Sequence, residues 1–143
     1  FIKPKIYITR TGNPFKAFID ENNFASNNFF SIQFKNYTFN SYDKLKPILG
    51  LLNSKFANYY IRKIIAPSLG NTFVETKIIH LLKLPISDEI LNSISITEKV
   101  DEILKLKQAN SLADTSKIEQ EIDQIVYKLY NLTEEEITIV ENS

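Results

Sequence analysis

Three short polar segments hold the side chains whose types could do chemistry in this sequence. They are Arg10 to Asn13, Ser26 to Asn28 and Ser68 to Thr72, and all three are rich in amide or hydroxyl groups. Lysines and arginines lie nearby along the chain. Lys and Arg neutralise phosphate groups, whereas Asn, Thr and Ser reach phosphate oxygens or base edges. Each residue alone is an ordinary loop residue, but together they favour binding to nucleic acid.

The residues that we expect to make these contacts are Arg10, Thr11, Lys16, Ser26, Asn27, Asn28, Lys35, Lys55, Ser68, Gly70, Asn71, Thr72 and Lys77. Lys55 and Lys77 are point charges on long stems, so we expect them to contact phosphates whatever the base sequence. Asn71 and Thr72 are the candidates for base edges, because an amide pairs bidentately with adenine in the major groove. Arg62 and Lys63 are further bases in the same part of the chain.

No pattern is typical of an active site. The three glycines are far apart, so there is no glycine-rich phosphate loop, and no cluster has metal-ligand spacing. His80 lies in an apolar stretch, where a hydrogen-bonded packing role is favoured over catalysis. Residues 75–77 offer half of a metal-dependent nuclease site. The upstream carboxylates that would complete it are only Asp20, Glu21 and Asp43. A nuclease is therefore disfavoured.

The formal net charge is zero, but two parts of the chain carry opposite charges. Residues 1–86 contain 12 Lys plus Arg against 4 Asp plus Glu, a net charge of +8. Residues 87–143 contain 5 against 13, a net charge of −8. Such asymmetry predicts a part that faces a polyanion and a part with another role. The alternative is chance clustering on two solvated faces.

The composition indicates a packed domain, with 43% hydrophobic and 12% aromatic residues. No apolar run approaches the roughly 20 residues that cross a bilayer, so we expect no membrane partner. Cysteine is absent, which excludes disulfides and fits a cytoplasmic protein. The chain begins at Phe1 without a basic and apolar leader, and we expect it to be a piece of a longer protein.

The first forty residues predict a small antiparallel sheet. Lys5 to Arg10 and Phe29 to Phe34 alternate and are rich in β-formers, and Phe15 to Ile19 is a further candidate strand. Lys35-Asn36 could close a hairpin onto Tyr37 to Phe39. The whole chain is thus predicted to be α+β: a small antiparallel sheet with packed helices, followed by a C-terminal helical hairpin.

Apolar residues recur at helical steps from Leu45 to Ile64, which predicts one helix. Asp43 or Ser41 could cap its start. A short helix from Lys77 to Lys83 is predicted to follow, capped by Thr76. The polar loop of residues 68–72 between these rigid helices is expected to enter a DNA groove or to grip the DNA backbone, and the alternative is a simple connector.

The C-terminal part reads as helical. One helix is marked by Val100 and Ile103, with apolar residues continuing toward Ala109. A second has heptad-like spacing at Ile118, Ile122, Ile125, Leu129 and Leu132. Ser116 with Glu119 and Thr133 with Glu136 are predicted capping boxes. These helices are expected to form a hairpin that packs within the molecule or on a neighbouring domain.

Several segments together resemble one known group of domains. Residues 26–30, SNNFF, resemble its SN-x-x-F/Y strand, and residues 48–55, ILGLLNSK, its L-L-x-x-L-N-S-K helix. Residues 70–77 with 84–86 resemble its glycine loop and the L-P-I-P that follows. Residues 121–137, EIDQIVYKLYNLTEEEI, resemble its EID-x-x-VY-x-LYGLT-x-EE ending, with Asn131 in place of the usual glycine. The group is the TaqI-like C-terminal specificity domain of restriction-modification methylases, which is related to the target-recognition domains of type I specificity subunits.

The resemblance implies sequence-specific recognition of double-stranded DNA on behalf of an N6-adenine methyltransferase, with or without a fused endonuclease. Residues 1–86 would be the recognition domain and residues 87–143 a helical tail. No cofactor is expected in this chain. S-adenosylmethionine, and Mg²⁺ if the parent also cuts DNA, would act in the parent, whose methyltransferase domain is the expected partner beside DNA.

Asn131 tolerates the left-handed geometry of a helix end nearly as well as glycine.

An alternative of another class remains. The heptad spacing also supports a helical module that binds a partner protein or dimerises, with the basic part serving as an α+β scaffold.

Overall fold

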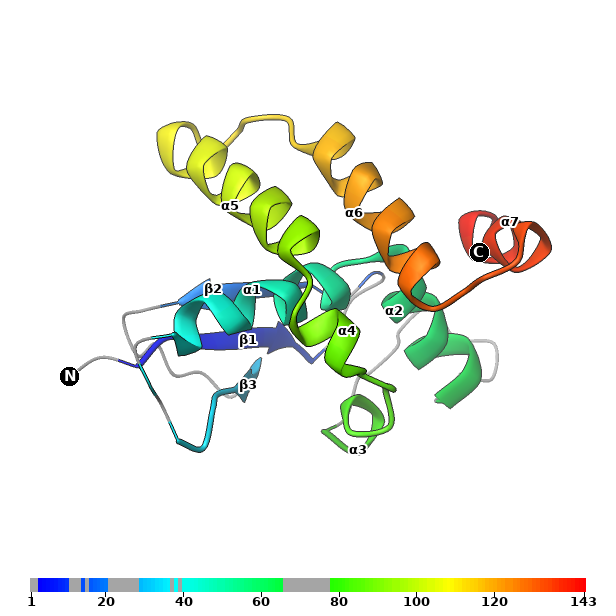
Figure 1. Ribbon diagram of the computed structural model, residues 1–143, viewed down its shortest axis with the longest axis horizontal. Coiled ribbons are helices and arrows are strands. Elements are labelled where there is room, and N and C mark those ends of the chain that lie inside the picture. The colour runs from blue at the N-terminus through cyan, green and yellow to red at the C-terminus, as the bar shows by residue number, and fades with distance from the viewer. Residues whose placement is uncertain are drawn as a thin grey trace.

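The chain has an α+β fold with a small antiparallel sheet and a helical C-terminal part, as the sequence predicts. The computed structural model describes residues 3–10, 14, 16–20, 29–36, 38, 40–65 and 78–143. The strands are β1 Lys5–Thr9, β2 Ala17–Asp20 and β3 Phe29–Ile32, in the order β2-β1-β3 with both pairings antiparallel. Helices cover one face of this sheet (Figure 1).

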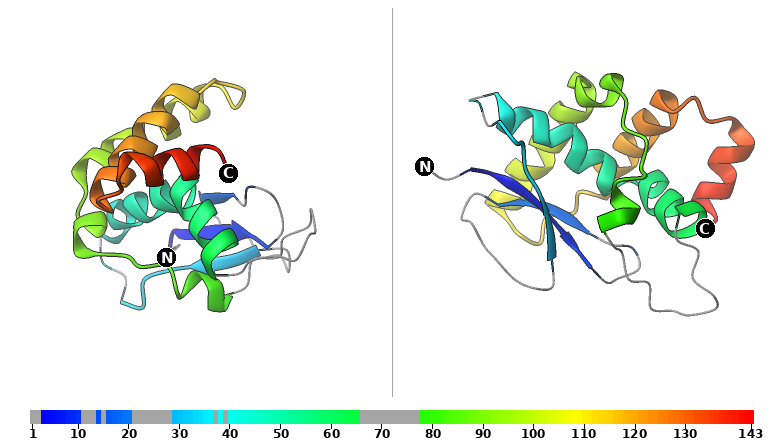
Figure 2. Two further views of the ribbon diagram at one scale, coloured as in Figure 1. Left: turned by 90° about the vertical axis from the view of Figure 1, so that its right-hand side faces the viewer. Right: turned by 90° about the horizontal axis from the view of Figure 1, so that it is seen from below.

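The two faces of the sheet differ because side chains alternate along a strand. Ile6 and Ile8 of β1 are fully buried and belong to the hydrophobic core. Tyr7 and its cross-strand partner Phe18 lie on the opposite face. Figure 2 shows α1 beside the strands, and among the described helices α1 makes the main contacts with the sheet, through β1 and β2 on the core face. We call the opposite face the open face because the described helices do not cover it, although Tyr7 at its centre is itself buried. Its residues are Lys5, Tyr7, Thr9, Lys16, Phe18, Asp20, Phe29 and Ser31.

The hairpin predicted to close at Lys35-Asn36 is not formed at Thr38, the described residue of its second strand, and the described partner of β3 is β1. Thr38 lies in no strand. Its backbone N–H donates to Ser41 Oγ at 2.8 Å, and its carbonyl accepts from the Ser41 N–H at 3.0 Å. Thr38 therefore belongs to the turn that leads into the first helix. Tyr37 and Phe39 lie outside the described residues.

The single helix predicted from Leu45 to Ile64 is divided in the structure. Its parts are α1 Ser41–Leu52, α2 Lys55–Tyr59 and the π-helix η1 Tyr60–Ile65. The prediction that Ser41 or Asp43 caps the start is also wrong. Asn40 occupies the cap position, and its side chain makes no capping hydrogen bond. The side chain of Ser41 instead holds the preceding turn.

Polar side chains explain the break between α1 and α2. Asn53 Nδ2 donates to the Ala17 carbonyl and Asn53 Oδ1 accepts from the Ala17 N–H, both at 2.8 Å. These two hydrogen bonds tie the end of α1 to the edge strand β2. Ser54 Oγ accepts from the Ala57 N–H at 3.2 Å and caps α2, which restarts the helix.

Two short helices follow. α3 spans Ile78–Leu81, inside the predicted range, whereas its predicted cap Thr76 lies outside the described residues. Residues 84–86 form no regular element, as expected for an extended segment, and Leu84 is buried. α4, Asp88–Leu91, was not predicted. Ser87 Oγ caps it by accepting from the Ile90 N–H at 3.4 Å.

The C-terminal part contains α5 Ile94–Ala109, α6 Ser116–Leu129 and α7 Glu134–Glu141. α5 and α6 form the predicted hairpin (Figure 1). The capping box of Thr133 with Glu136 is confirmed, and Asn131 has φ of 53°, the left-handed geometry that was expected. The box at Ser116 is wrong. Ser116 is the first helical residue, and its N–H and Oγ both donate to Asp114 Oδ1.

One hydrophobic core joins the basic and acidic parts of the chain. α1 lies between the sheet and the α5–α6 hairpin, and it contacts both. At Gly50 of α1 the helices are so close that an added Cβ would lie 2.5 Å from Ile96 Cγ2 and 3.1 Å from Val100 Cγ2. Ile122 of α6 is buried at the same place, while Ile125 and Leu129 are partly buried against the core. The predicted packing within the molecule is confirmed.

Candidate nucleic-acid interface

Four of the predicted contact residues lie in the described part of the structure. They are Arg10, Lys16, Lys35 and Lys55. The others lie outside the described residues: Thr11, Ser26, Asn27, Asn28, Ser68, Gly70, Asn71, Thr72 and Lys77. The interface is therefore built here from the four described side chains and from the elements that hold them.

Arg10 and Lys16 are brought together at one end of the sheet. The Thr9 N–H donates to the Lys16 carbonyl at 2.9 Å, and the Lys16 N–H donates to Thr9 Oγ1 at 3.0 Å. These bonds extend the pairing of β1 and β2 by one residue. The Arg10 guanidinium lies 4.6 Å from the centre of the Phe30 ring, a cation–π contact that orients it. Lys16 is exposed. This end of the sheet therefore carries two positive charges, Lys16 on the open face and Arg10 on the face of Phe30 and Ile8.

Lys35 is exposed but lies at the other end of the sheet. It follows β3, whose last residue Ile32 pairs with Ile6 near the start of β1. Antiparallel pairing places Thr9 and Lys35 at opposite ends of the strands. Lys35 can therefore contact the same duplex as Arg10 and Lys16 only if the duplex runs along the sheet.

An aromatic cluster lies on the open face between these two ends. The rings of Tyr7 and Phe18 stack with their centres 5.6 Å apart, and Phe29 packs edge-on against Phe18 at 5.4 Å. Phe18 remains 37% exposed. The cluster makes the centre of the open face apolar and rigid, and positive charges flank it.

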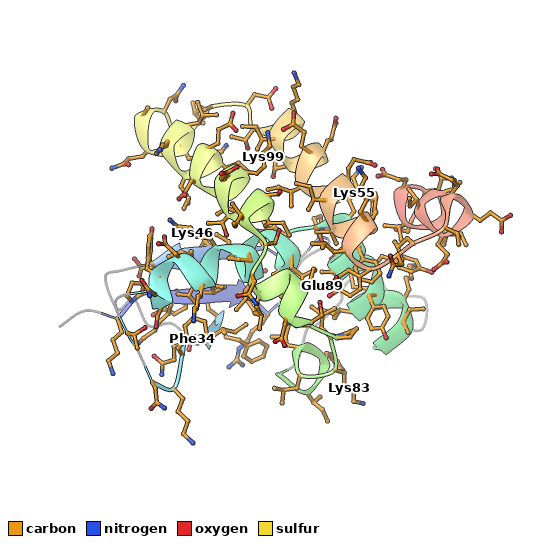
Figure 3. All side chains as sticks on the ribbon, in the orientation of Figure 1. Phe34, Lys46, Lys55, Lys83, Glu89 and Lys99 are labelled. Atoms are coloured by element: carbon orange, nitrogen blue, oxygen red, sulfur yellow. The ribbon has the colours of Figure 1, made fainter. Side chains whose placement is uncertain are left out.

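Lys55 lies away from the open face. Its ammonium Nζ is 2.7 Å from Glu141 Oε2 of α7, and Figure 3 shows the side chain directed toward that helix. The hydrogen bond to Glu141 raises the pKa of Lys55, although burial opposes the change. The structure thus does not bring Lys55 together with Arg10 and Lys16. Its predicted role as a phosphate contact stays a prediction, because such a contact would have to compete with Glu141.

The backbone of Lys55 is held as well. Its N–H donates to Asp123 Oδ1 of α6 at 3.0 Å, so a buried carboxylate lies at the N-terminus of α2. Burial raises the pKa of Asp123 to about 6, although the hydrogen bond from Lys55 opposes the change. Tyr127 donates its hydroxyl hydrogen to Glu141 Oε1 at 2.7 Å, which completes the group. We call Lys55, Asp123, Tyr127 and Glu141 the junction.

Lys46 is a second lysine of the basic part that acidic side chains neutralise. Its ammonium lies 2.6 Å from an Asp101 oxygen on α5 and 2.8 Å from Asp43 Oδ1. Burial by itself lowers the pKa of Lys46, but hydrogen bonds to Asp101 and Asp43 outweigh it and the pKa is raised. Figure 3 shows Lys46 between α1 and α5. This charge therefore joins helices and is not available to a ligand.

Several segments quoted for the resemblance meet one another in the structure. Asn53, Ser54 and Lys55 of the NSK sequence hold β2, α2 and α7, and Asp123 of the EID sequence holds the start of α2. Tyr130 donates its hydroxyl hydrogen to the Pro85 carbonyl. The sequence signal for these roles was present in the motifs, but it was interpreted as DNA contact at Lys55.

The sequence reasoning left out Lys83, which is exposed next to α3. α3 contacts η1, so Lys83 joins Arg62 and Lys63 on neighbouring elements. A signal was available. From residue 55 to residue 83 the chain has five Lys or Arg and a single acidic residue, Glu75. η1 is also a π-helix, a rare geometry that often marks functional sites.

An α+β domain with an open sheet face and flanking positive charges has the general form of a binding module. The comparison with known families is more specific. The TaqI-like C-terminal specificity domain matches residues 1–86, more than half of the chain, and the chain belongs to this family. These are DNA sequence-specificity domains of restriction-modification enzymes. No curated protein matches the sequence.

None of the described helices has the length and the apolar composition needed to span a membrane. No group of three or more His, Asp or Glu side chains within the described residues could hold a metal ion.

Proposed function

We propose that this chain recognises a specific sequence in double-stranded DNA as part of a restriction-modification adenine methyltransferase. One coincidence carries the proposal. The family match covers residues 1–86, and these are the residues that carry a net charge of +8. A specificity domain has to hold a polyanion, and positive charge supplies the part of the affinity that does not depend on base sequence.

In this proposal the chain makes two kinds of contact with DNA, one with the phosphate backbone and one with base edges. Lys16 holds the DNA backbone beside the open face, Arg10 holds it at the same end of the sheet, and Lys77 adds a phosphate contact. Asn71 and Thr72 contact base edges, where an amide and a hydroxyl give direction to the hydrogen bonds. Thr11, Ser26, Asn27, Asn28, Ser68 and Gly70 complete the proposed surface.

The chemistry belongs elsewhere in the parent enzyme. The parent's methyltransferase domain, with S-adenosylmethionine, transfers the methyl group to adenine N6, and Mg²⁺ is required if the parent also cuts DNA. The target adenine is rotated out of the duplex into that domain while the present chain holds the duplex. The chain itself recognises and does not catalyse, and it works in the cytoplasm, where its DNA is.

The alternative of a helical interaction module has less support. Its basis was the heptad spacing on α6, and the apolar residues at that spacing are used inside the chain. Ile118 and Ile122 are buried, and Ile122 packs at Gly50 of α1. A partner helix would have to displace α1 and α5 to reach them.

Fluorescence anisotropy with a labelled duplex tests the function. The whole chain is used, because one core joins both of its parts. The chain should bind the duplex at low salt, and its affinity should fall steeply as salt is added. A plot of the logarithm of the binding constant against the logarithm of the salt concentration should have a slope of about −0.9 for each phosphate contact. Lys16→Ala should reduce this slope by about 1. Lys117→Ala, which removes an exposed lysine of the tail, should leave the slope unchanged. A folded protein that binds no duplex at low salt would contradict the proposal.

A second experiment separates reading the sequence from holding the backbone, and it uses the full-length parent. Asn71→Ala should reduce the preference for cognate over random DNA by about 1–3 kcal/mol. Lys77→Ala should weaken binding to both about equally. If Asn71→Ala leaves the preference intact, the loop grips the backbone or is a connector, and base reading moves to Arg10 and residues 26–28.

A further inference from the structure

η1 and α3 together expose apolar and basic side chains that the core does not use. Leu82 is 80% exposed, Ile79 57% and Ile64 55%. Lys63 and Lys83 are exposed beside them. We call these five residues the ridge. Scattered apolar residues on a surface are ordinary, but neighbouring ones beside charges of one sign mark an interaction site.

The ridge is held firmly from behind. Leu84, directly after Lys83, is buried in the core. The carbonyl of Pro85 accepts the hydroxyl hydrogen of Tyr130 on the C-terminal side of α6. Pro85 and Ile64 line a common cavity of about 340 Å³, which places the segment after α3 beside η1. A rigid base of this kind lets exposed side chains bind with little loss of conformational freedom.

Charge decides which partner fits. Lys55 and Lys46 are neutralised by acidic residues of the tail and α1, but no ion pair within the described residues involves Lys63 or Lys83. The stretch from residue 55 to residue 83 has five basic residues against one acidic residue. A surface that combines unneutralised lysines with projecting apolar side chains is complementary to a nucleic-acid groove, which has phosphates on its rims and apolar sugar and base surface within.

We infer that the ridge is a second contact surface for duplex DNA, in which Lys63 and Lys83 bind phosphates and Leu82 lies in a groove between them. The inference rests on the proposed function and adds an element to it. It assigns DNA contact to η1 and to α3 with the turn that follows it, on both sides of residues 66–77 in the chain. Ile64 and Ile79 flank Leu82 and extend the apolar surface.

Two ridge variants with matched controls in the tail test the inference, using the whole chain and a labelled duplex of mixed sequence. Leu82→Ser is compared with Leu112→Ser, since Leu112 is also exposed, at 89%, but lies at the tip of the α5–α6 hairpin. The double variant Lys63→Ala/Lys83→Ala is compared with Lys105→Ala/Lys117→Ala, which removes two exposed tail lysines. Thermal unfolding of all four should match the wild type, because the substituted side chains are exposed.

The two ridge variants should fail in different ways. Leu82→Ser should weaken binding about tenfold without a change in salt slope, because it removes an apolar contact and no charge. The double lysine variant should reduce the salt slope by about 2, with the tail controls unchanged. A ridge variant that binds like its tail control overturns the inference, and the ridge then serves a protein partner. Failure of the wild type itself to bind DNA would instead overturn the proposed function.

Discussion

The junction and the ridge are both built around lysines of the basic part, yet they use these lysines in opposite ways. At the junction, Lys55 has an ion-pair partner for its ammonium and a carboxylate acceptor for its backbone N–H. At the ridge, Lys63 and Lys83 are exposed. Net charge alone therefore does not identify a DNA-binding surface. Part of the +8 is used to attach the acidic tail.

The acidic tail has a role in the distribution of positive charge. Its acidic residues neutralise basic residues that lie toward α5, α6 and α7, on the side of α1 away from the sheet. Among the described residues, most of the remaining lysines and arginines lie at the sheet ends, on η1 and directly after α3. An acidic surface against phosphates would be repelled, so we expect the tail to point away from DNA.

The largest expected effect is that of removing the tail. A chain that ends at residue 86 loses α5 and α6, which bury Leu49 and Gly50 of α1 together with Ile96, Val100 and Ile122. We expect this fragment to lose cooperative thermal unfolding, as followed by circular dichroism. A fragment that unfolds cooperatively with a melting temperature near that of the whole chain would show that the tail is a separate domain.

The next effect concerns the pH dependence of the junction. The pKa of Asp123 is about 6 in the folded chain and 3.8 ordinarily, so folding favours its protonated form. Its contribution to the unfolding free energy should therefore be greatest below pH 4 and disappear as pH rises through 6. A shift of this size corresponds to about 3 kcal/mol at most.

Urea unfolding of the wild type and of Asp123→Asn at pH 5 and pH 7.5 measures this contribution. The wild type should gain stability relative to the variant as the pH falls. Lys55, Glu141 and Glu119 also face Asp123, and both proteins keep these groups, so their titration largely cancels in the difference. An equal stability difference at the two pH values would show that Asp123 does not titrate in this range.

A smaller effect tests the close contact of α1 with α5. Gly50→Val should lower the unfolding free energy by about 1–3 kcal/mol, because the added carbons overlap Ile96 and Val100 in a packed core. Gly50→Ala should cost less, since a better helix former partly offsets the overlap. Denaturant unfolding provides the values. A stabilised Gly50→Val would mean that the helices separate without cost.

The smallest expected effect concerns Lys55, the lysine of the junction. Lys55→Ala should lower the unfolding free energy by about 0.5–1 kcal/mol, since the ion pair with Glu141 is half exposed. The salt slope of DNA binding should not change if Glu141 keeps the Lys55 ammonium from phosphate. Glu141→Gln, which removes the same ion pair from the other side, is the matched variant. A slope reduced by about 1 in Lys55→Ala alone would support the predicted phosphate contact of Lys55.

The sequence by itself determined the local elements and the family. Alternation identified β1 and β3, apolar periodicity identified α5 and α6 and predicted α1, α2 and η1 as one helix, and Thr133 with Glu136 marked the start of α7. The geometry at Asn131 was also predictable, because only a few residue types tolerate a positive φ. These features depend on neighbours within a few positions along the chain, which is why a single sequence reveals them.

Tertiary structure decided the features whose partners lie far away in the chain. The helix breaks after α1 because Asn53 finds Ala17, which is 36 positions earlier. Lys55 is neutralised because Glu141, 86 positions later, is brought to it by α7. The spacing of apolar residues along the chain does not show such contacts between distant residues. The same basic residue reads alike in the sequence whether it is paired inside the fold or exposed on the ridge, and only the arrangement of the elements separates the two.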